Sequence, residues 1–143
     1  MIAVDTNLLV YAHRADMHQH TIAVAAMRGL AEGRQPWAVA WPCLHEFLAT
    51  VTSTKFKPAS SPQLAWTALR NLVASPSLRL IGEGVNHLQW LGRFVERGTV
   101  RGGAIHDARI AAICLAHGVN ELWTADRDFS KFPELKTYNP LTA

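Results

Sequence analysis

Short apolar runs rich in β-branched and aromatic residues alternate along the chain with longer segments in which apolar residues recur every three or four positions. The short runs predict strands, and the longer segments predict amphipathic helices. Alternation of strand and helix throughout is typical of an α/β protein whose parallel sheet is covered by helices on both faces. The predicted strands are residues 1–5, 35–41, 77–82, 120–126 and 135–140. The predicted helices are residues 6–14, 20–33, 42–52, 63–75, 85–98 and 104–118.

Local signals support these boundaries. Pro42 stands where proline starts a helix, and Gly33 stands where glycine stops one. The amino-terminal cap of the first helix is predicted near Thr6 or Asn7, because short polar side chains favour that position. A basic loop rich in serine and proline, residues 53–62, separates two of the predicted helices.

Two acidic residues directly follow or end predicted strands. Asp5 closes the first strand, and Asp126 closes the fourth. In a parallel α/β sheet the carboxyl ends of the strands share one rim, and ligands bind there. These two carboxylates are therefore predicted to lie near that rim. Because Asp5 stands within an apolar run, its burial is costly unless another group compensates for it.

Asp107 lies on the apolar face of its predicted helix, three, four and seven positions before Ile110, Ala111 and Cys114. That face must point inward, and Asp107 with it. The alternative is an ordinary first-turn acid, favoured by the helix dipole. The sequence leaves both interpretations of Asp107 open.

Glu46 and Asp128 are weaker candidates on periodicity alone. Glu46 projects from the side opposite to the apolar stripe of its helix, which favours a solvated position. It nevertheless falls in the first turns after a strand, near the predicted rim. Asp128 follows Asp126 by two positions and faces the same way if the backbone stays extended, although aspartate is also common in turns.

Several carboxylates on one rim repel one another and raise one another's pKa unless a cation neutralises them. Oxygen ligands without paired histidines or a Cys-x-x-Cys motif select Mg²⁺ or Mn²⁺ over Zn²⁺. A divalent metal ion is therefore the predicted partner of Asp5. Such an ion lowers the pKa of a bound water, which then serves as the nucleophile, and it stabilises charge that develops on a phosphate.

The charge of the chain is compatible with phosphodiester chemistry. Its formal net charge is +3, a mild excess that fits a nucleic-acid partner without requiring one. Basic side chains would hold the nucleic-acid backbone near the acids. Basic residues near the predicted rim are Lys55, Lys57, Arg97, Arg101, Arg109 and Arg127. Of these, the candidates for RNA binding are Lys55, Lys57, Arg101 and Arg109.

Length and composition predict a single domain, residues 1–143, since no repeat or long linker divides the sequence. No run of about 18 apolar residues predicts a membrane span, and no basic segment precedes an apolar stretch as in a signal peptide. Cys43 and Cys114 lie far apart and are predicted to be buried free thiols in a reducing cytoplasm.

Four blocks of the sequence are distinctive when they are taken together. They are VDTNLLVY at residues 4–11, EFL at 46–48, GGAIHDARIAAICLAHGV at 102–119 and LWTADRDFSKFPELKTYNP at 122–140. In this order and at these separations the chain resembles the PIN-domain ribonucleases and, more narrowly, the VapC toxins of bacterial toxin–antitoxin pairs. The resemblance covers nearly the whole chain.

The resemblance implies a three-layer α/β/α sandwich with a central, mainly parallel sheet. It also implies an endoribonuclease that depends on Mg²⁺ or Mn²⁺ and cleaves transfer RNA or another structured RNA. The implied catalytic and metal-binding set is Asp5, Glu46, Asp107 and Asp126. The implied supporting residues are Thr6, Asn7, Thr124 and Asp128.

The resemblance further implies partners. Such toxins are generally homodimers, held inactive by a cognate VapB-type antitoxin whose carboxyl-terminal segment lies across the active-site groove. Operator DNA is bound only through the antitoxin, and the expected location is the bacterial cytoplasm, without membrane contact.

Other classes of protein fit less well. A phosphoacceptor of the haloacid-dehalogenase type needs an acid two positions after the nucleophile, where this chain has Asn7. A receiver domain needs an aspartate that closes a middle strand, whereas Asp107 opens a helix. A structure-specific DNA nuclease carries additional helical elements for which the chain is short. The remaining alternative is a non-catalytic PIN-fold module that only docks an antitoxin or RNA, and the complete acid set argues against it.

Overall fold

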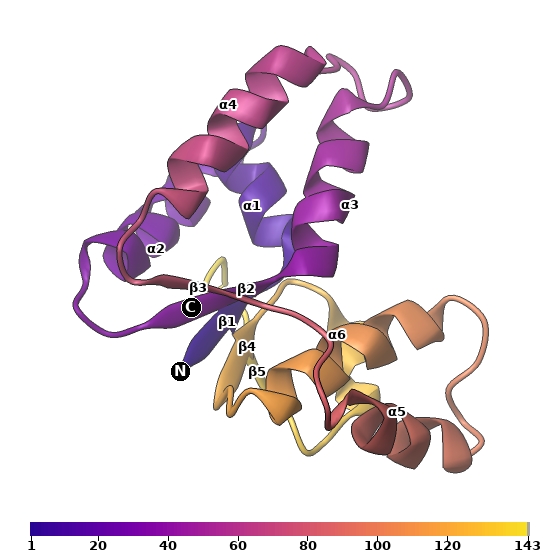
Figure 1. The fold of residues 1–143 in the computed structure, drawn as a ribbon. Helices are drawn as coiled ribbons and strands as arrows, with labels where there is room; N and C mark the ends of the chain where they lie inside the picture. Colours follow the sequence, from indigo (N-terminus) through magenta and orange to yellow (C-terminus); the bar gives the residue numbers. More distant parts are fainter. Residues whose placement is uncertain (143) are drawn as a thin grey trace.

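The computed structural model describes residues 1–142, which form a parallel sheet between two layers of helices (Figure 1). The strands are β1 (Ile2–Val4), β2 (Trp37–Ala40), β3 (Leu78–Ile81), β4 (Glu121–Trp123) and β5 (Lys136–Tyr138). They lie in the order β3-β2-β1-β4-β5, and every neighbouring pair is parallel. The helices are α1 (Thr6–His13), α2 (His20–Glu32), α3 (Trp41–Thr52), α4 (Pro62–Val73), α5 (His87–Glu96) and α6 (Ala104–Ala116).

Helices α1 to α4 lie on one side of the sheet, and α5 and α6 lie on the other (Figure 1). This arrangement confirms the predicted α/β/α sandwich, and each predicted strand and helix is present within a few residues of its predicted bounds. A short 3₁₀ helix, η1 (Arg127–Lys131), follows β4 and was absent from the sequence prediction. Among residues 1–142, the structure shows no helix that is both long and apolar enough to cross a membrane.

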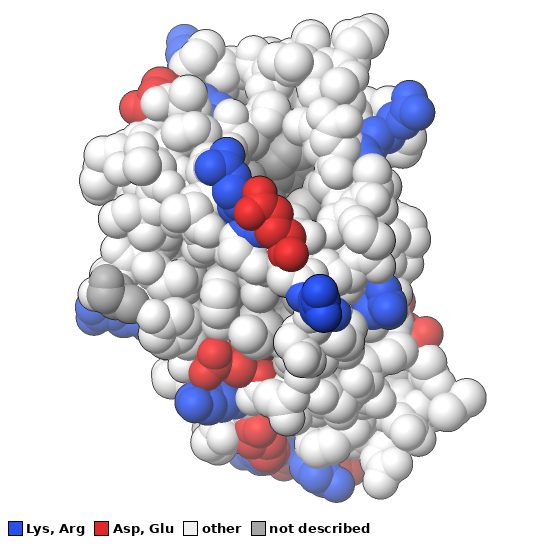
Figure 2. Space-filling model, turned by 90° about the vertical axis from the view of Figure 1, so that its left-hand side faces the viewer, with Lys and Arg blue, Asp and Glu red and all other residues white. Residues whose placement is uncertain are grey.

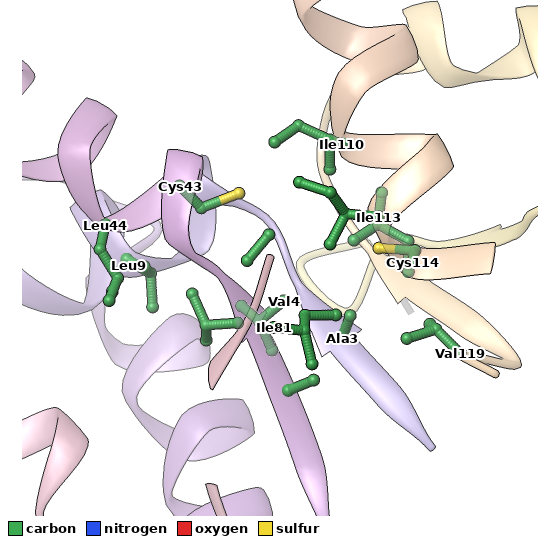
Figure 3. Close-up of a cluster of buried hydrophobic side chains, with 14 of the residues drawn as sticks. Ala3, Val4, Leu9, Cys43, Leu44, Ile81, Ile110, Ile113, Cys114 and Val119 are labelled. Carbon is green, nitrogen blue, oxygen red and sulfur yellow. The ribbon is translucent and has the colours of Figure 1, made fainter. Parts of the chain in front are cut away.

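The core fills both sides of the central strand. Figure 3 shows Leu9 and Leu44 on the side of α1 and α3, and Ile113 of α6 on the opposite side of β1. The residues of β2 and most of those of β1 are buried on both faces, as expected for the centre of a parallel sheet covered twice, whereas the edge strand β5 is exposed. Both cysteines are buried and free, as predicted from the sequence.

Strand β1 lies between β2 and β4, because the chain adds β2 and β3 on one side of β1 and later adds β4 and β5 on the other. In such sheets a crevice forms beyond the carboxyl ends of the strands at the point where the chain changes sides. Asp5 stands at that point. It also caps α1, because its side chain accepts a hydrogen bond from the backbone N–H of Thr6 at 2.8 Å. The cap thus lies one residue before Thr6, the first of the two predicted positions. The reason is that the strand passes into the helix without a loop, so the acid that ends the strand also caps the helix.

The loop between α3 and α4, residues 53–60, is fastened to the end of α1. Arg14 is 5% exposed, and its guanidinium lies 4.3 Å from the ring centroid of Phe56 and donates to the carbonyl oxygen of Lys57 at 3.1 Å. Asp16 holds the same guanidinium by two hydrogen bonds of 2.7 Å. A third attachment joins Nε2 of His13 to the hydroxyl of Ser60 at 2.8 Å. The end of α1 thus fixes the position of this loop.

We expect Arg14→Met to loosen the loop without unfolding the protein, because methionine preserves much of the apolar contact but none of the hydrogen bonds. Trypsin should then cut after the exposed Lys55 several-fold faster than in the unaltered protein, as followed by mass spectrometry. Arg28→Met is the matched control, since Arg28 forms an exposed ion pair with Glu32 on α2. Equal rates of cleavage after Lys55 in all three proteins would contradict the proposed attachment.

Candidate active site

A cleft of about 670 Å³ lies beyond the carboxyl ends of the central strands. Its walls come from α1 and α3, from the loops that follow these two helices, from the beginning of α6 and from the segment after β4. The predicted supporting residues Thr6 and Asn7 line it. So do the four predicted catalytic carboxylates, Asp5, Glu46, Asp107 and Asp126. The structure therefore brings the predicted acids to one rim, and their chemical roles stay predictions.

Asp5 is the most buried of these acids, with 7% of its surface exposed. Its Oδ1 accepts hydrogen bonds from the backbone N–H of Thr6 at 2.8 Å and from the thiol of Cys43 at 3.6 Å. Its Oδ2 accepts from the hydroxyl of Thr124 at 2.8 Å and from the side-chain amide of Asn7 at 3.3 Å. Burial raises the pKa of Asp5 above its ordinary value, while the bonds from Thr124 and Thr6 oppose that rise. These donors replace much of the hydration that the carboxylate loses.

Asn7 and Thr124 connect β1 to the segment after β4. The Thr124 hydroxyl donates to Asp5 and accepts from the Asn7 side-chain amide at 3.1 Å and from the backbone N–H of Asp126 at 3.0 Å. Its one proton and both lone pairs are therefore used. The Asn7 side-chain oxygen accepts from the backbone N–H of Ala125 at 3.1 Å. This network sets the position of Asp126 relative to Asp5.

Asp107, Asp126 and Asp128 form a tight carboxylate cluster in which one oxygen from each side chain lies within 4.8 Å of the others. Asp126 also caps η1, because its Oδ1 accepts from the backbone N–H of Asp128 at 2.8 Å. Asp107 sits in the first turn of α6. Burial and then the negative charges of Asp126, Asp5 and Asp128 raise the pKa of Asp107 to about 6, and Lys131 opposes this rise.

Both sequence interpretations of Asp107 hold at once: it is a first-turn acid, and it is half-buried above Ile110, Ala111 and Cys114, which are themselves buried. Asp128, which the sequence presented as an auxiliary acid, belongs to the tight cluster, whereas Asp5 lies outside it.

Glu46 is exposed on α3, as its helical periodicity predicts, and it nevertheless lines the cleft, as its position after β2 predicts. The Thr6 hydroxyl holds it, donating toward Glu46 Oε2 at 3.2 Å with the Cys43 carbonyl oxygen at 3.4 Å as a second acceptor. Thr6 thereby links α3 to the cap of α1. Glu46 shares the cleft with the carboxylate cluster but does not belong to it.

Of the four basic residues predicted to bind RNA, Arg109 alone lines the cleft. Its Nε donates to Glu83 Oε1 at 2.7 Å, and this bond lowers the pKa of Glu83. Because both side chains of the pair are about half exposed, the pair is open to exchange with an incoming phosphate. Arg101 is exposed and lies beyond the lining of the cleft.

Lys55 and Lys57 are exposed in the loop fastened to α1, on either side of Phe56, which lines the cleft. The two lysines therefore border the cleft without lining it. On the face of the molecule shown in Figure 2, positive and negative groups lie side by side within a largely uncharged surface. The mild positive net charge is thus not gathered into a basic patch on that face.

Sequence reasoning missed several residues of the cleft. It treated Cys43 only as a buried thiol, but that thiol donates to Asp5. Burial and the charge of Asp5 raise the pKa of Cys43 well above its ordinary value, so it keeps the proton that it donates. The position of Cys43 just after β2, on the side of Glu46, predicted a place near the rim, but nothing in the sequence indicated its bond to Asp5. Tyr11 and Phe56 also line the cleft.

The donor set fits a hard divalent cation. The tight cluster consists of carboxylates alone among the residues that the structure describes, and oxygen donors of this kind suit Mg²⁺ or Mn²⁺. The mutual repulsion that raises the pKa of Asp107 is the repulsion that a bound cation would relieve. Asp107, Asp126 and Asp128 are the residues placed to hold such an ion, with Asp5 and Glu46 facing the same cleft.

Comparisons with known proteins show the family and the fold of the chain. The family model of the PIN domain matches residues 2–135. The chain is 34% identical over 143 residues to ribonuclease VapC43 from Mycobacterium tuberculosis, an alignment that covers 99% of this chain and 96% of the relative. It is 32% identical over 146 residues to ribonuclease VapC33 from the same organism, with 99% of each chain covered.

Solved structures show the same fold. The chain matches the VapBC2 structure from Rickettsia felis, bound to a promoter DNA fragment, with a TM-score of 0.69, 22% identity and coverage of 97% of this chain and 98% of the other. It matches VapC20 from Mycobacterium tuberculosis, a sarcin-ricin loop cleaving toxin, with a TM-score of 0.65, 19% identity and coverage of 91% and 93%.

The raised pKa of Asp107 predicts that Asp107→Asn stabilises the metal-free protein. The folded state holds this proton up to a pH of about 6, whereas the unfolded chain releases it near 3.8. The charged carboxylate therefore disfavours folding above a pH of about 6. The full shift corresponds to about 3 kcal/mol, but solvent screens this half-exposed group, so we expect a gain on the order of 1 kcal/mol.

Urea unfolding in EDTA measures this gain, which should be present near neutral pH and fade as the pH falls from about 6 toward 4. Glu96→Gln, an exposed position on α5, serves as the control and should show no such dependence. If Asp107→Asn is less stable than the unaltered protein near neutral pH, the charge of Asp107 does not disfavour folding and the prediction is wrong.

Thr124→Val should destabilise the protein by about 1–3 kcal/mol, because it leaves buried hydrogen-bonding groups of Asp5 and Asn7 without their partner. The side chain keeps its size and branching, so packing changes little. Chemical denaturation measures the loss, and Thr137→Val on the exposed strand β5 is the matched control. Equal stability of the two variants would show that the network contributes nothing.

Proposed function

Because the chain belongs to the PIN-domain family and, within it, to the VapC ribonucleases, we propose that it is a metal-dependent endoribonuclease that acts as the toxin of a toxin–antitoxin pair. The observation that carries this proposal is the convergence of Asp5, Glu46, Asp107 and Asp126 on one cleft. Asp128 adds a further carboxylate to the tight cluster. Carboxylates gathered this closely repel one another unless a cation neutralises them.

We propose Mg²⁺ or Mn²⁺ as the cofactor, held by the carboxylates of the tight cluster together with Asp5 and Glu46. When bound, such an ion supplies a nucleophilic water near neutral pH and neutralises charge that develops on the phosphate. The chemistry of the donor set supports this assignment.

The side chains around the acids have positioning roles in this proposal. Asn7 and Thr124 hold the Asp5 carboxylate in one orientation, and Thr6 does the same for Glu46. Arg109 stands at the cleft, where it exchanges Glu83 for a phosphate oxygen of the substrate. A guanidinium suits that role because its donors match the geometry of a phosphate.

The proposed substrate is structured RNA. The relatives at 34% and 32% identity are named ribonucleases, which favours RNA over DNA. Transfer RNA is the family-typical target, whereas the structurally similar VapC20 is a toxin that cleaves the sarcin-ricin loop. Action on RNA would take place in the bacterial cytoplasm.

A VapB-type antitoxin is the proposed protein partner, with operator DNA bound through the antitoxin. The similar structures from Rickettsia felis and Haemophilus influenzae are those of VapBC2 and VapBC-1. A second pocket of about 160 Å³, lined largely by apolar side chains from α1 to α4, would accept an apolar side chain of the antitoxin.

Exposed apolar side chains at the beginnings of α3 and α5 support a homodimer. They are Trp41, Val85 and Leu88.

Cleavage of total bacterial RNA by the purified, antitoxin-free protein tests the proposal. We expect discrete fragments with Mg²⁺ or Mn²⁺ and none in EDTA. Asp107→Asn should reduce the rate by about 100-fold or more, since it removes a charged ligand. Glu96→Gln should cleave as the unaltered protein does.

Calorimetric titration with Mn²⁺ separates metal binding from cleavage. The unaltered protein should bind the ion, and Asp107→Asn should bind it much more weakly. A folded protein that binds RNA but leaves it intact at every metal concentration would instead favour the non-catalytic module.

A further inference from the structure

The cleft extends past the acids to a second, largely apolar wall. Val10, Tyr11, Met17 and Phe56 line this end, and the carboxylates line the other. A water molecule takes up roughly 30 Å³, so a cleft of about 670 Å³ is far larger than a metal ion and its waters require. The cleft therefore has room for a ligand beside the metal, and its apolar wall would contact that ligand.

Helix α1 joins the two ends of the cleft. Asp5 caps the helix at the acidic end, and Tyr11 lies six residues further along it. At about 1.5 Å per residue this separation is about 9 Å along the helix axis, roughly the reach from a phosphate across one sugar to its base. An RNA strand with a phosphate at the acids therefore brings an adjacent base to the apolar wall.

Phe56 is held rigidly at this wall. The Arg14 guanidinium covers one side of its ring at 4.3 Å from the centroid. The same guanidinium is fixed by Asp16 and by the carbonyl oxygen of Lys57. Phe56 is half-buried and lines the cleft, and an aromatic ring restrained in this way is suited to stacking because little freedom is lost on binding.

We propose that Phe56 and Tyr11 form a subsite that stacks one nucleobase of the RNA strand, on the nucleotide next to the cleaved bond. This inference rests on the proposed ribonuclease function and adds to it the means by which the strand is positioned. Stacking on aromatic rings tolerates any base, so the subsite aligns the strand more than it reads sequence.

The charges around the wall favour a nucleic acid as the occupant. Lys55 and Lys57 flank Phe56 and are both exposed, so they can meet the phosphates on either side of a stacked base. The wall is also continuous with the acidic end, because both belong to one cleft. Binding of an apolar antitoxin side chain at this wall is the outcome that competes with a base.

The test uses a single-stranded RNA oligonucleotide that contains the bond cleaved in total bacterial RNA by the unaltered protein. Phe56→Leu removes the ring and keeps an apolar side chain, so KM should rise by roughly 5- to 100-fold, the loss expected for one stacked base. The change in kcat should be smaller. Phe56→Tyr keeps a ring and should restore KM. Trp66→Leu, an exposed aromatic position on α4 outside the cleft lining, is the matched control and should leave KM unchanged.

A second measurement removes the base from the RNA instead of the ring from the protein, so its first arm uses the unaltered protein alone. Abasic nucleotides are placed one at a time along the oligonucleotide. At one position next to the cleaved bond, the missing base should raise KM for the unaltered protein but not further for Phe56→Leu. Such non-additivity assigns that base to this ring.

The outcomes separate the subsite from the proposed function. If the unaltered protein cleaves the oligonucleotide but Phe56→Leu has the same KM, or if the two losses simply add at every position, the subsite is wrong and the nuclease stands. If the unaltered protein cleaves no RNA at all, the proposed function fails and the subsite fails with it.

Discussion

The burial of one carboxylate, that of Asp5, is the constraint on which the rest of the site depends. A charged group on the central strand of an apolar sheet is unfavourable unless fixed donors surround it. This chain supplies those donors from three distant segments: the start of α1, the start of α3 and the end of β4. The same bonds that make the burial tolerable also set where Asp126 and Glu46 lie, because Thr124 and Thr6 each contact two of the acids.

The topology explains why the donors meet at this point. Parallel strands place all their carboxyl ends on one edge, and the chain runs from β1 to β2 and β3 on one side before it crosses to β4 and β5 on the other. The beginnings of α1, α3 and α6 then converge on the crevice. Acids that begin helices or end strands are thus collected in one place although they lie far apart in the sequence.

Much of this could be predicted from the sequence, and the failures have physical causes. Hydrophobic periodicity located the strands and helices, and the rule for parallel sheets placed Asp5 and Asp126 on one rim. Periodicity alone could not show that Glu46 is both exposed and part of the cleft, because a helix at the edge of a crevice has a solvated side that is also a wall. A contact between two side chains from distant segments leaves no local pattern in the sequence. The hydrogen bond from Arg109 to Glu83 therefore could not be predicted.

Residues of the apolar wall were missed for a related reason. Phe56 lies in a loop that the sequence describes only as basic and rich in serine and proline, and its position depends on the buried Arg14 some forty residues earlier. An arginine at the end of a predicted helix has no feature that distinguishes it from a solvated one. Arg14 is buried because the loop packs against the end of α1, and this contact is known only from the structure.

The hydrogen bond between Asp5 and Thr124 spans 119 positions of the sequence, and this separation has a consequence for how the protein comes into being. During synthesis the first strand, the cap and Glu46 are made early, but they have no Thr124, Asp126 or Asp128 to complete the site until the ribosome has nearly reached β5. An unfinished chain therefore has no assembled carboxylate site. For the proposed ribonuclease, this means that the acids converge only when translation is nearly complete.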